Sequence, residues 1–160
     1  MGHDAVEIDF VMPWVDGSDP AWREEFLKYR ALQAPQGEPA CDTGTAAGAV
    51  DASEERYRDW DTLRYWFRGV ERFAPWVNRI HFITWGHLPA WLDTAHPKLH
   101  VVRHADYIPS PYLPTFNSCP IELNMHRIEG LAEHFVYFND DTFLCRPVGP
   151  ERFFLNGLPR

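Results

Sequence analysis

The sequence predicts an α/β fold built on a mostly parallel sheet with helices packed against it. Three times along the chain, a short apolar run is followed by a segment with helical features. The apolar runs, such as residues 135–138, lack the strict polar alternation of a half-exposed strand. Strands of this kind are typical of parallel sheets, whose helical crossovers cover both faces.

Composition limits the possible classes of protein. With 160 residues and 45% hydrophobic content, the chain fits one globular domain with its own core. A formal net charge of −8 argues against nucleic acid as the main partner, because phosphate backbones attract clustered Lys and Arg. The three cysteines are far apart and form no CxxC pair, which favours a reducing compartment over a disulfide framework.

No apolar run reaches the roughly 18 residues of a transmembrane helix, and the acidic N-terminus does not resemble a signal peptide. We therefore expect no transmembrane segment and a cytoplasmic location, with a peripheral position at the inner face of the membrane as a second option.

The first unit is a predicted strand over residues 8–12, closed by Pro13. A loop follows, in which Gly17 permits positive φ and a close approach of the backbone to a ligand. Asp19 and Pro20 give a capped helix start. The next turns repeat aromatic residues at helical spacing: Trp22, Phe26 and Tyr29.

Residues 34–55 lose all apolar periodicity and are interpreted as a flexible surface insertion or linker inside a single domain spanning residues 1–160. Asp61 is the expected cap of the next helix, which ends before Pro75. That helix carries an arginine stripe at i, i+4 and i+8: Arg64, Arg68 and Arg72. The stripe fits a phosphate clamp and a solvated helix face equally well.

Residues 80–85 and 99–102 are further predicted strands, separated by a short expected helix at residues 89–92. His81 and His100 fall inside these strands, where a histidine is more often hydrogen-bonded and structural than a ligand. An extended loop rich in proline and tyrosine follows at residues 106–114.

The last helix is expected to begin at Asn117 and Ser118, with a buried stripe formed by Ile121, Met125, Ile128 and Ala132. Glu122 and His126 lie four residues apart on another face, with Glu129 one turn further along. They form either a base pair for catalysis or an ordinary surface pair.

The chemistry centres on residues 134–146, where an apolar strand runs into Asn139, Asp140 and Asp141. In open α/β sheets, ligands bind at the carboxyl edge of the strands. Two adjacent carboxylates there suit Mg²⁺ or Mn²⁺ shared with substrate phosphates. A polar turn between two strands explains the same residues equally well.

Residues 8–20 (IDFVMPWVDGSDP) resemble the first conserved region of the Stealth family. Its second region is matched at residues 58–60 (RDW), 63–65 (LRY), 74–78 (APWVN), 113–118 (LPTFNS), 126–131 (HRIEGL) and 137–141 (YFNDD). The family includes bacterial capsular and exopolysaccharide sugar-phosphate transferases, and the catalytic subunit that builds the mannose 6-phosphate tag in animals.

The resemblance implies a metal-dependent hexose-1-phosphotransferase with a Rossmann-like, glycosyltransferase-type core. Its donor is a nucleotide-diphosphate sugar and its acceptor a hydroxyl on a glycan or polysaccharide, so that the product is a phosphodiester. The catalytic residues implied are Asp16, Arg64, His126 and Asp140, with Asp140 and Asp141 as the metal pair. The substrate-binding residues implied are Trp14, Val15, Gly17, Arg68, Asn117 and Arg127.

The chain departs from the family pattern because two further conserved regions, which contribute active-site His and Arg residues, would follow Arg160. We therefore expect residues 1–160 alone to be catalytically incomplete. A metal-dependent glycosyltransferase, in which the acceptor attacks the anomeric carbon of the donor sugar, is one alternative. A nucleotide-sugar binding fragment without catalysis is the other.

Overall fold

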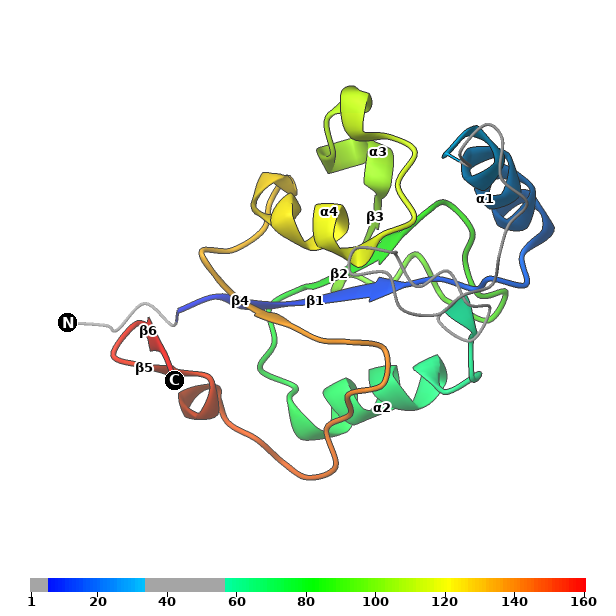
Figure 1. Cartoon of the computed structure of the whole chain (residues 1–160). Coiled ribbons are helices and arrows are strands. Elements are labelled where there is room, and N and C mark those ends of the chain that lie inside the picture. The colour runs from blue at the N-terminus through cyan, green and yellow to red at the C-terminus, as the bar shows by residue number, and fades with distance from the viewer. Residues whose placement is uncertain (1–5, 34–56) are drawn as a thin grey trace, which may run out of the picture. The chain divides into compact units, whose positions relative to one another are not determined.

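Four parallel strands form the central sheet, in the order β3-β2-β1-β4 (Figure 1). The strands are β1 (Ile8–Trp14), β2 (Ile80–Thr84), β3 (Leu99–Arg103) and β4 (His134–Tyr137). This all-parallel sheet confirms the predicted α/β class. Because β2 and β3 lie on one side of β1 and β4 on the other, the strand order reverses between β1 and β4. Ligands of doubly wound sheets bind at such a switch point.

The computed structural model describes residues 6–33 and 57–160. The chain divides into two units, one formed by Met1–Trp14 and Trp60–Arg160, the other by Val15–Asp59. The expected insertion at residues 34–55 lies outside the described residues. Within the described residues, no helix is both long and apolar enough to cross a membrane.

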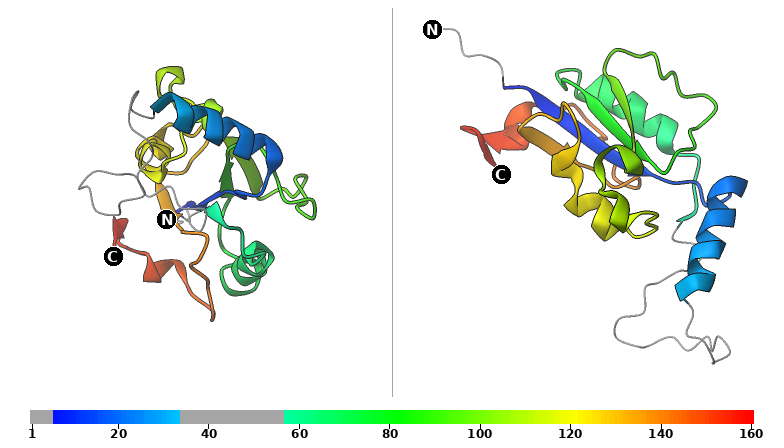
Figure 2. Two further views of the ribbon diagram at one scale, coloured as in Figure 1. Left: turned by 45° about the vertical axis from the view of Figure 1, so that its right-hand side comes forward. Right: turned by 90° about the horizontal axis from the view of Figure 1, so that it is seen from above.

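Helices cover both faces of the sheet (Figures 1 and 2). Helix α2 (Leu63–Phe73) packs on the face of the sheet that carries Phe10 and Phe82. Trp66 of this helix is buried in the same core. Helices α3 (His104–Tyr107) and α4 (Ser118–Leu123) lie on the opposite face. Alternating residues of one buried strand, such as Phe10 and Val11, therefore enter two separate cores.

Pro13 lies inside β1, so the prediction that it closes the strand is wrong. In β1, Val11 directs its backbone toward β4, since its carbonyl accepts from Phe138 N at 2.9 Å. Pro13 faces the same side, and pairing with β4 ends at Val11 opposite Tyr137. The missing N–H of Pro13 therefore removes no hydrogen bond from the sheet.

Two smaller expectations about helices are also wrong. The segment at residues 89–92 is a single turn, closed by Leu92 N donating to the carbonyl of Pro89 at 3.0 Å. Asp61 does not cap α2: Thr62 is the N-cap, and Asp61 has a left-handed φ of 53°. Its carboxylate instead accepts from the Arg64 guanidinium at 2.9 Å.

The helix expected from residue 117 to residue 132 stops early. Asn117 caps α4 as predicted, by accepting from Cys119 N at 2.9 Å. Asn124 then ends the helix, and its side-chain amide donates to the carbonyl of Pro120 at 2.8 Å. A 3₁₀ turn, η3 (Met125–Arg127), follows, so Glu122 and His126 do not share a helix face.

The chain ends, after η4 (Pro150–Arg152), in a short antiparallel hairpin of β5 (Phe154–Leu155) and β6 (Leu158–Pro159). Between Phe143 and Val148 the chain runs along α2, where Trp76 Nε1 donates to the carbonyl of Val148 at 2.7 Å. An earlier 3₁₀ turn, η2 (Ser110–Tyr112), occupies the proline-rich loop.

A buried polar network ties three strands to the segment before β4. Asp9, fully buried in β1, accepts from Asn78 Nδ2 at 2.8 Å, from His81 Nε2 at 2.9 Å and from Ala132 N at 2.9 Å. His100 Nδ1 lies 3.0 Å from His81 Nδ1, which accepts because its Nε2 donates to Asp9. Burial lowers the pKa of His81 and favours this neutral form. These contacts make both histidines structural.

The second unit contains α1 (Pro20–Gln33). As predicted, Asp19 caps this helix, since its carboxylate accepts from Trp22 N at 2.9 Å. The ring of Tyr57 lies 4.9 Å from Trp22 and 5.2 Å from Phe26. This aromatic cluster is the core of the described part of the unit.

Candidate active site

The strands deliver polar residues to one edge of the sheet. Trp14 pairs with Thr84, and Thr84 with Arg103, so that β1, β2 and β3 end at the same level. On the other side of β1, β4 ends at Tyr137 and leads directly into residues 139–141. The structure thus places Asn139, Asp140 and Asp141 at the carboxyl edge beside β1, where the sequence predicted them.

A tyrosine stands at the centre of this acidic group. The Tyr137 phenol oxygen lies 2.7 Å from Asn139 Oδ1 and 3.1 Å from Glu122 Oε1 on α4. Burial, together with the nearby carboxylates of Glu122, Asp140 and Asp141, raises the pKa of Tyr137. The phenol therefore stays protonated at neutral pH and acts as a hydrogen-bond donor. Sequence reasoning missed Tyr137, which reads as one more apolar residue of the strand.

The metal expectation rests on the oxygen chemistry of this edge. Asp140 and Asp141 are exposed, and Thr142 Oγ1 donates to Asp141 Oδ1 at 3.3 Å. Among the described residues, no group of three or more His, Cys, Asp or Glu side chains is arranged to hold a metal. Two carboxylates still match the way in which proteins bind Mg²⁺, with water and substrate phosphates as the other ligands. Metal binding stays a prediction.

Arg64 lies in the first turn of α2, at the same end of the sheet. Its guanidinium donates to Asp61 and lies 5.6 Å from the ring centre of Trp91. Its Nε is buried without a hydrogen-bond partner among the described residues. Arg68 follows one turn later, over the Tyr65 ring at 5.8 Å.

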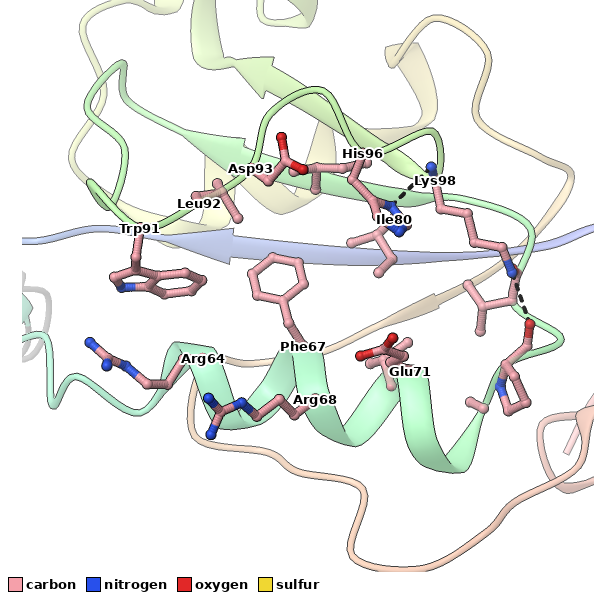
Figure 3. A pocket seen from close by; sticks show the side chains of 15 residues that line it. Arg64, Phe67, Arg68, Glu71, Ile80, Trp91, Leu92, Asp93, His96 and Lys98 are labelled. Atoms are coloured by element: carbon pink, nitrogen blue, oxygen red, sulfur yellow. Dashed lines mark hydrogen bonds between the residues drawn. The ribbon is translucent and has the colours of Figure 1, made fainter.

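Only two members of the arginine stripe line a common pocket. Arg64 and Arg68 both border a pocket of about 540 Å³ between α2 and the segment that joins β2 to β3 (Figure 3). Arg72 lies over the Phe73 ring instead, at 5.8 Å. The pocket was not predicted, because its walls come from separate segments of the chain.

Further buried nitrogens at this end of the sheet lack hydrogen-bond partners among the residues that the structure describes. They are Trp14 Nε1 at the end of β1, Trp66 Nε1 in the first turn of α2, and His104 Nδ1 directly after β3. Burial, and to a lesser extent His87, lowers the pKa of His104 to about 4, so its imidazole is neutral at pH 7. Unsatisfied buried donors are costly. Phosphate or hydroxyl oxygens can satisfy such donors.

The remaining predicted site residues have different surroundings. His126 and Arg127 are exposed in η3, and the Asn117 side chain is used as the cap of α4. No contact among the described residues tests the catalytic role expected of His126 or the substrate-binding role expected of Asn117 and Arg127.

The second unit contains three more of the predicted site residues: Val15, Asp16 and Gly17. Asp16 Oδ1 accepts from Ser18 N at 2.9 Å and from Ser18 Oγ at 2.6 Å. Gly17 does not adopt the positive φ that the sequence allowed. It is needed because a Cβ would lie 2.7 Å from the carbonyl oxygen of Tyr57, to which Gly17 N donates at the same distance.

Comparison with known proteins identifies two conserved regions of one family in this chain. Residues 6–32 match Stealth protein CR1, conserved region 1, and residues 56–159 match Stealth protein CR2, conserved region 2. A "capsular polysaccharide phosphotransferase WcwK" of Streptococcus pneumoniae is 54% identical over 153 residues. A "receptor polysaccharide phosphotransferase WefC" of Streptococcus oralis is 47% identical over 161 residues. An "exopolysaccharide phosphotransferase SCO6023" of Streptomyces coelicolor is 48% identical over 155 residues.

Each of these alignments covers 96% of this chain, but only 43% of the two streptococcal proteins and 24% of the Streptomyces protein. The chain therefore spans less than half the length of these relatives. The carboxyl edge of the sheet is formed by the end of β1, in the first matched region, and by the ends of β2, β3 and β4, in the second. The chain belongs to the Stealth family.

Proposed function

We propose that this chain carries the donor-binding part of a polysaccharide phosphotransferase, which transfers a sugar 1-phosphate from a nucleotide-diphosphate sugar to an acceptor hydroxyl. Family membership and the names of the relatives support phosphotransfer in polysaccharide synthesis. The observation that carries the proposal is the polar cluster of Tyr137, Asn139, Asp140 and Asp141 at the switch point between β1 and β4.

In the proposed reaction, the acceptor oxygen attacks the phosphorus nearer the sugar. A new P–O bond forms, the bond to the nucleoside monophosphate breaks, and that nucleotide leaves with its electron pair. The hydroxyl proton passes to a base, for which His126 is our candidate because it lies in the HRIEGL stretch that matches the second conserved region of the family. The product is a phosphodiester between sugar and acceptor.

Each residue at the edge has a proposed task. Arg64, whose Nε is buried without a partner among the described residues, would donate to the phosphoryl oxygens. The Asp140 and Asp141 carboxylates would hold Mg²⁺ or Mn²⁺, which when bound neutralises pyrophosphate charge. The neutral phenol of Tyr137 would orient Asn139 beside them.

The proposal is tested by calorimetric titration of the chain with UDP-N-acetylglucosamine and a panel of other nucleotide sugars, with Mn²⁺ and then with chelator. Metal-dependent binding of one donor is the expected result. Failure of the whole panel, in a chain shown by circular dichroism to be folded, would contradict it.

The product identifies the reaction in an assay of a protein that spans the full length of the relatives. A phosphodiester ³¹P signal on the acceptor is expected. A glycosidic linkage with release of nucleoside diphosphate would instead establish the glycosyltransferase alternative.

A further inference from the structure

The pocket between α2 and the β2–β3 segment is separate from the acidic cluster at the β1–β4 switch point. It is bordered by Arg64 and Trp91 at the carboxyl end of the sheet and by Pro75 and Lys98 near the start of β2 and β3 (Figure 3). It therefore extends along α2 and away from the proposed donor site. Arg64 is the lining residue that also has a proposed role in donor binding.

The dimensions of the pocket fit an elongated small ligand. Its volume of about 540 Å³ falls within the range of ordinary ligand sites. Along α2, its lining extends from Arg64 to Glu71 and beyond. At the rise of an α-helix, the distance between these two residues is on the order of 10 Å. Two linked hexose rings have a comparable length.

An aromatic wall stands at the carboxyl end of the pocket. Trp91 is 40% exposed, although it belongs to the apolar lining. The edge-on Phe67 ring, with its centre 6.1 Å away, supports the indole from inside. The Arg64 guanidinium lies over the Trp91 ring at 5.6 Å, so a ligand would contact the part of the indole that Arg64 leaves exposed. That part has apolar carbons beside a polar N–H, which suits a ligand that has both apolar and polar surfaces. The C–H faces and hydroxyl rim of a pyranose ring are of that kind.

Charges around the pocket are nearly balanced. Arg64 is paired with Asp61, and Lys98 Nζ donates to the carbonyls of Pro75 at 2.8 Å and Val77 at 2.7 Å. Glu71 and Asp93 add negative charge along the same lining as Arg68. A pyrophosphate would meet these carboxylates at a cost. A neutral ligand rich in hydroxyl groups can instead donate to the acids and accept from the arginine.

We propose that this pocket binds a neutral segment, about two sugar rings long, of the saccharide acceptor chain. The choice of ligand rests on the proposed function. The acceptor chain would lie on Trp91 and along α2, with one end directed past Arg64 toward the acidic edge. The pocket would thereby select the acceptor, whereas the β1–β4 edge binds the donor.

Side-chain indole signals in ¹⁵N–¹H NMR spectra provide the test. We would titrate the chain with lactose, cellobiose and N-acetyllactosamine, without metal or nucleotide. The expected result is a shift of the Trp91 indole signal by at least one disaccharide. In the variants, which lack the Trp91 signal, binding is followed on the NMR signals of the disaccharide itself. Trp91→Ala should weaken that binding about tenfold, as expected for loss of one well-placed aromatic contact, and Trp91→Phe less.

Trp60→Phe is the matched control, because Trp60 is 69% exposed and does not line the pocket. It should leave disaccharide binding unchanged. Absence of a Trp91 shift with every disaccharide would overturn the proposal, and so would a Trp91 shift caused by UDP instead. Because no donor or metal is present, this result is independent of the donor titration. A failed proposed function and a failed acceptor pocket are therefore distinguishable.

Discussion

The phenol of Tyr137 lies 3.1 Å from a carboxylate oxygen of Glu122 and so joins the end of β4 to α4. These residues are 15 positions apart, on a strand and a helix that the sequence analysis treated separately. Their contact fixes the last residue of β4 immediately before Asn139 and Asp140. The position of the acidic edge thus depends on a hydrogen bond from a neighbouring element.

Tyr137→Phe should lower the free energy of unfolding by about 1 kcal/mol, because the phenol has a single proton, shared between oxygens of Asn139 and Glu122, and both oxygens lose this donor. Urea denaturation followed by circular dichroism measures the change. Tyr65→Phe is the matched control, since Tyr65 is 59% exposed, and it should have little effect. Equal stability of both variants would show that the Tyr137 phenol contributes nothing to the position of β4.

Asp141→Asn should weaken metal-dependent donor binding about tenfold or more, because one of two proposed carboxylate ligands loses its charge. Glu129→Gln removes the same charge from an exposed position outside the proposed metal pair. Calorimetry with Mn²⁺ compares the two variants. Equal losses in both would contradict the assignment of Asp141 and indicate a general effect of net charge.

Much of the sheet could be predicted from the sequence, because apolar runs and turn residues are local signals. The strand that leads into Asn139–Asp141 and the Asp19 cap were found in this way. The helix break at Asn124 was missed, since Met125 in the 3₁₀ turn and Ile128 directly after it are both buried, as they would be in a helix. Apolar spacing alone does not distinguish these two conformations.

Contacts over long sequence separations were beyond local patterns. Asp9 accepts from His81, 72 residues away, and from Ala132, 123 residues away. A carboxylate inside a strand gives no sign of such partners, although an acidic residue in an otherwise apolar run is itself unusual. The pocket beside α2 was missed for the same reason, because its walls come from separate segments of the chain.

Arg64→Lys should weaken donor binding about tenfold while the metal requirement stays the same, because lysine cannot reproduce the planar donors of arginine. Arg72→Lys provides the control on the same helix, since Arg72 does not line the pocket. Calorimetric titration with the nucleotide sugar that the donor panel identifies compares the two variants. If Arg64→Lys binds as tightly as the unsubstituted chain, Arg64 is a structural partner of Asp61 and Trp91 only.

Acid should destabilise the chain through His104, which is only 9% exposed. Burial lowers its pKa from 6.5 to about 4, so that below pH 6.5 the unfolded chain binds a proton that the folded chain does not. The free energy of unfolding should fall as the pH drops from 6.5 to about 4, by at most about 3 kcal/mol from this residue.

Urea denaturation across this range should show a shallower pH dependence in His104→Gln than in the unsubstituted chain. His126→Gln, at an exposed position, should keep the original slope. An unchanged slope in His104→Gln would mean that other groups, such as the buried His81, account for the acid sensitivity.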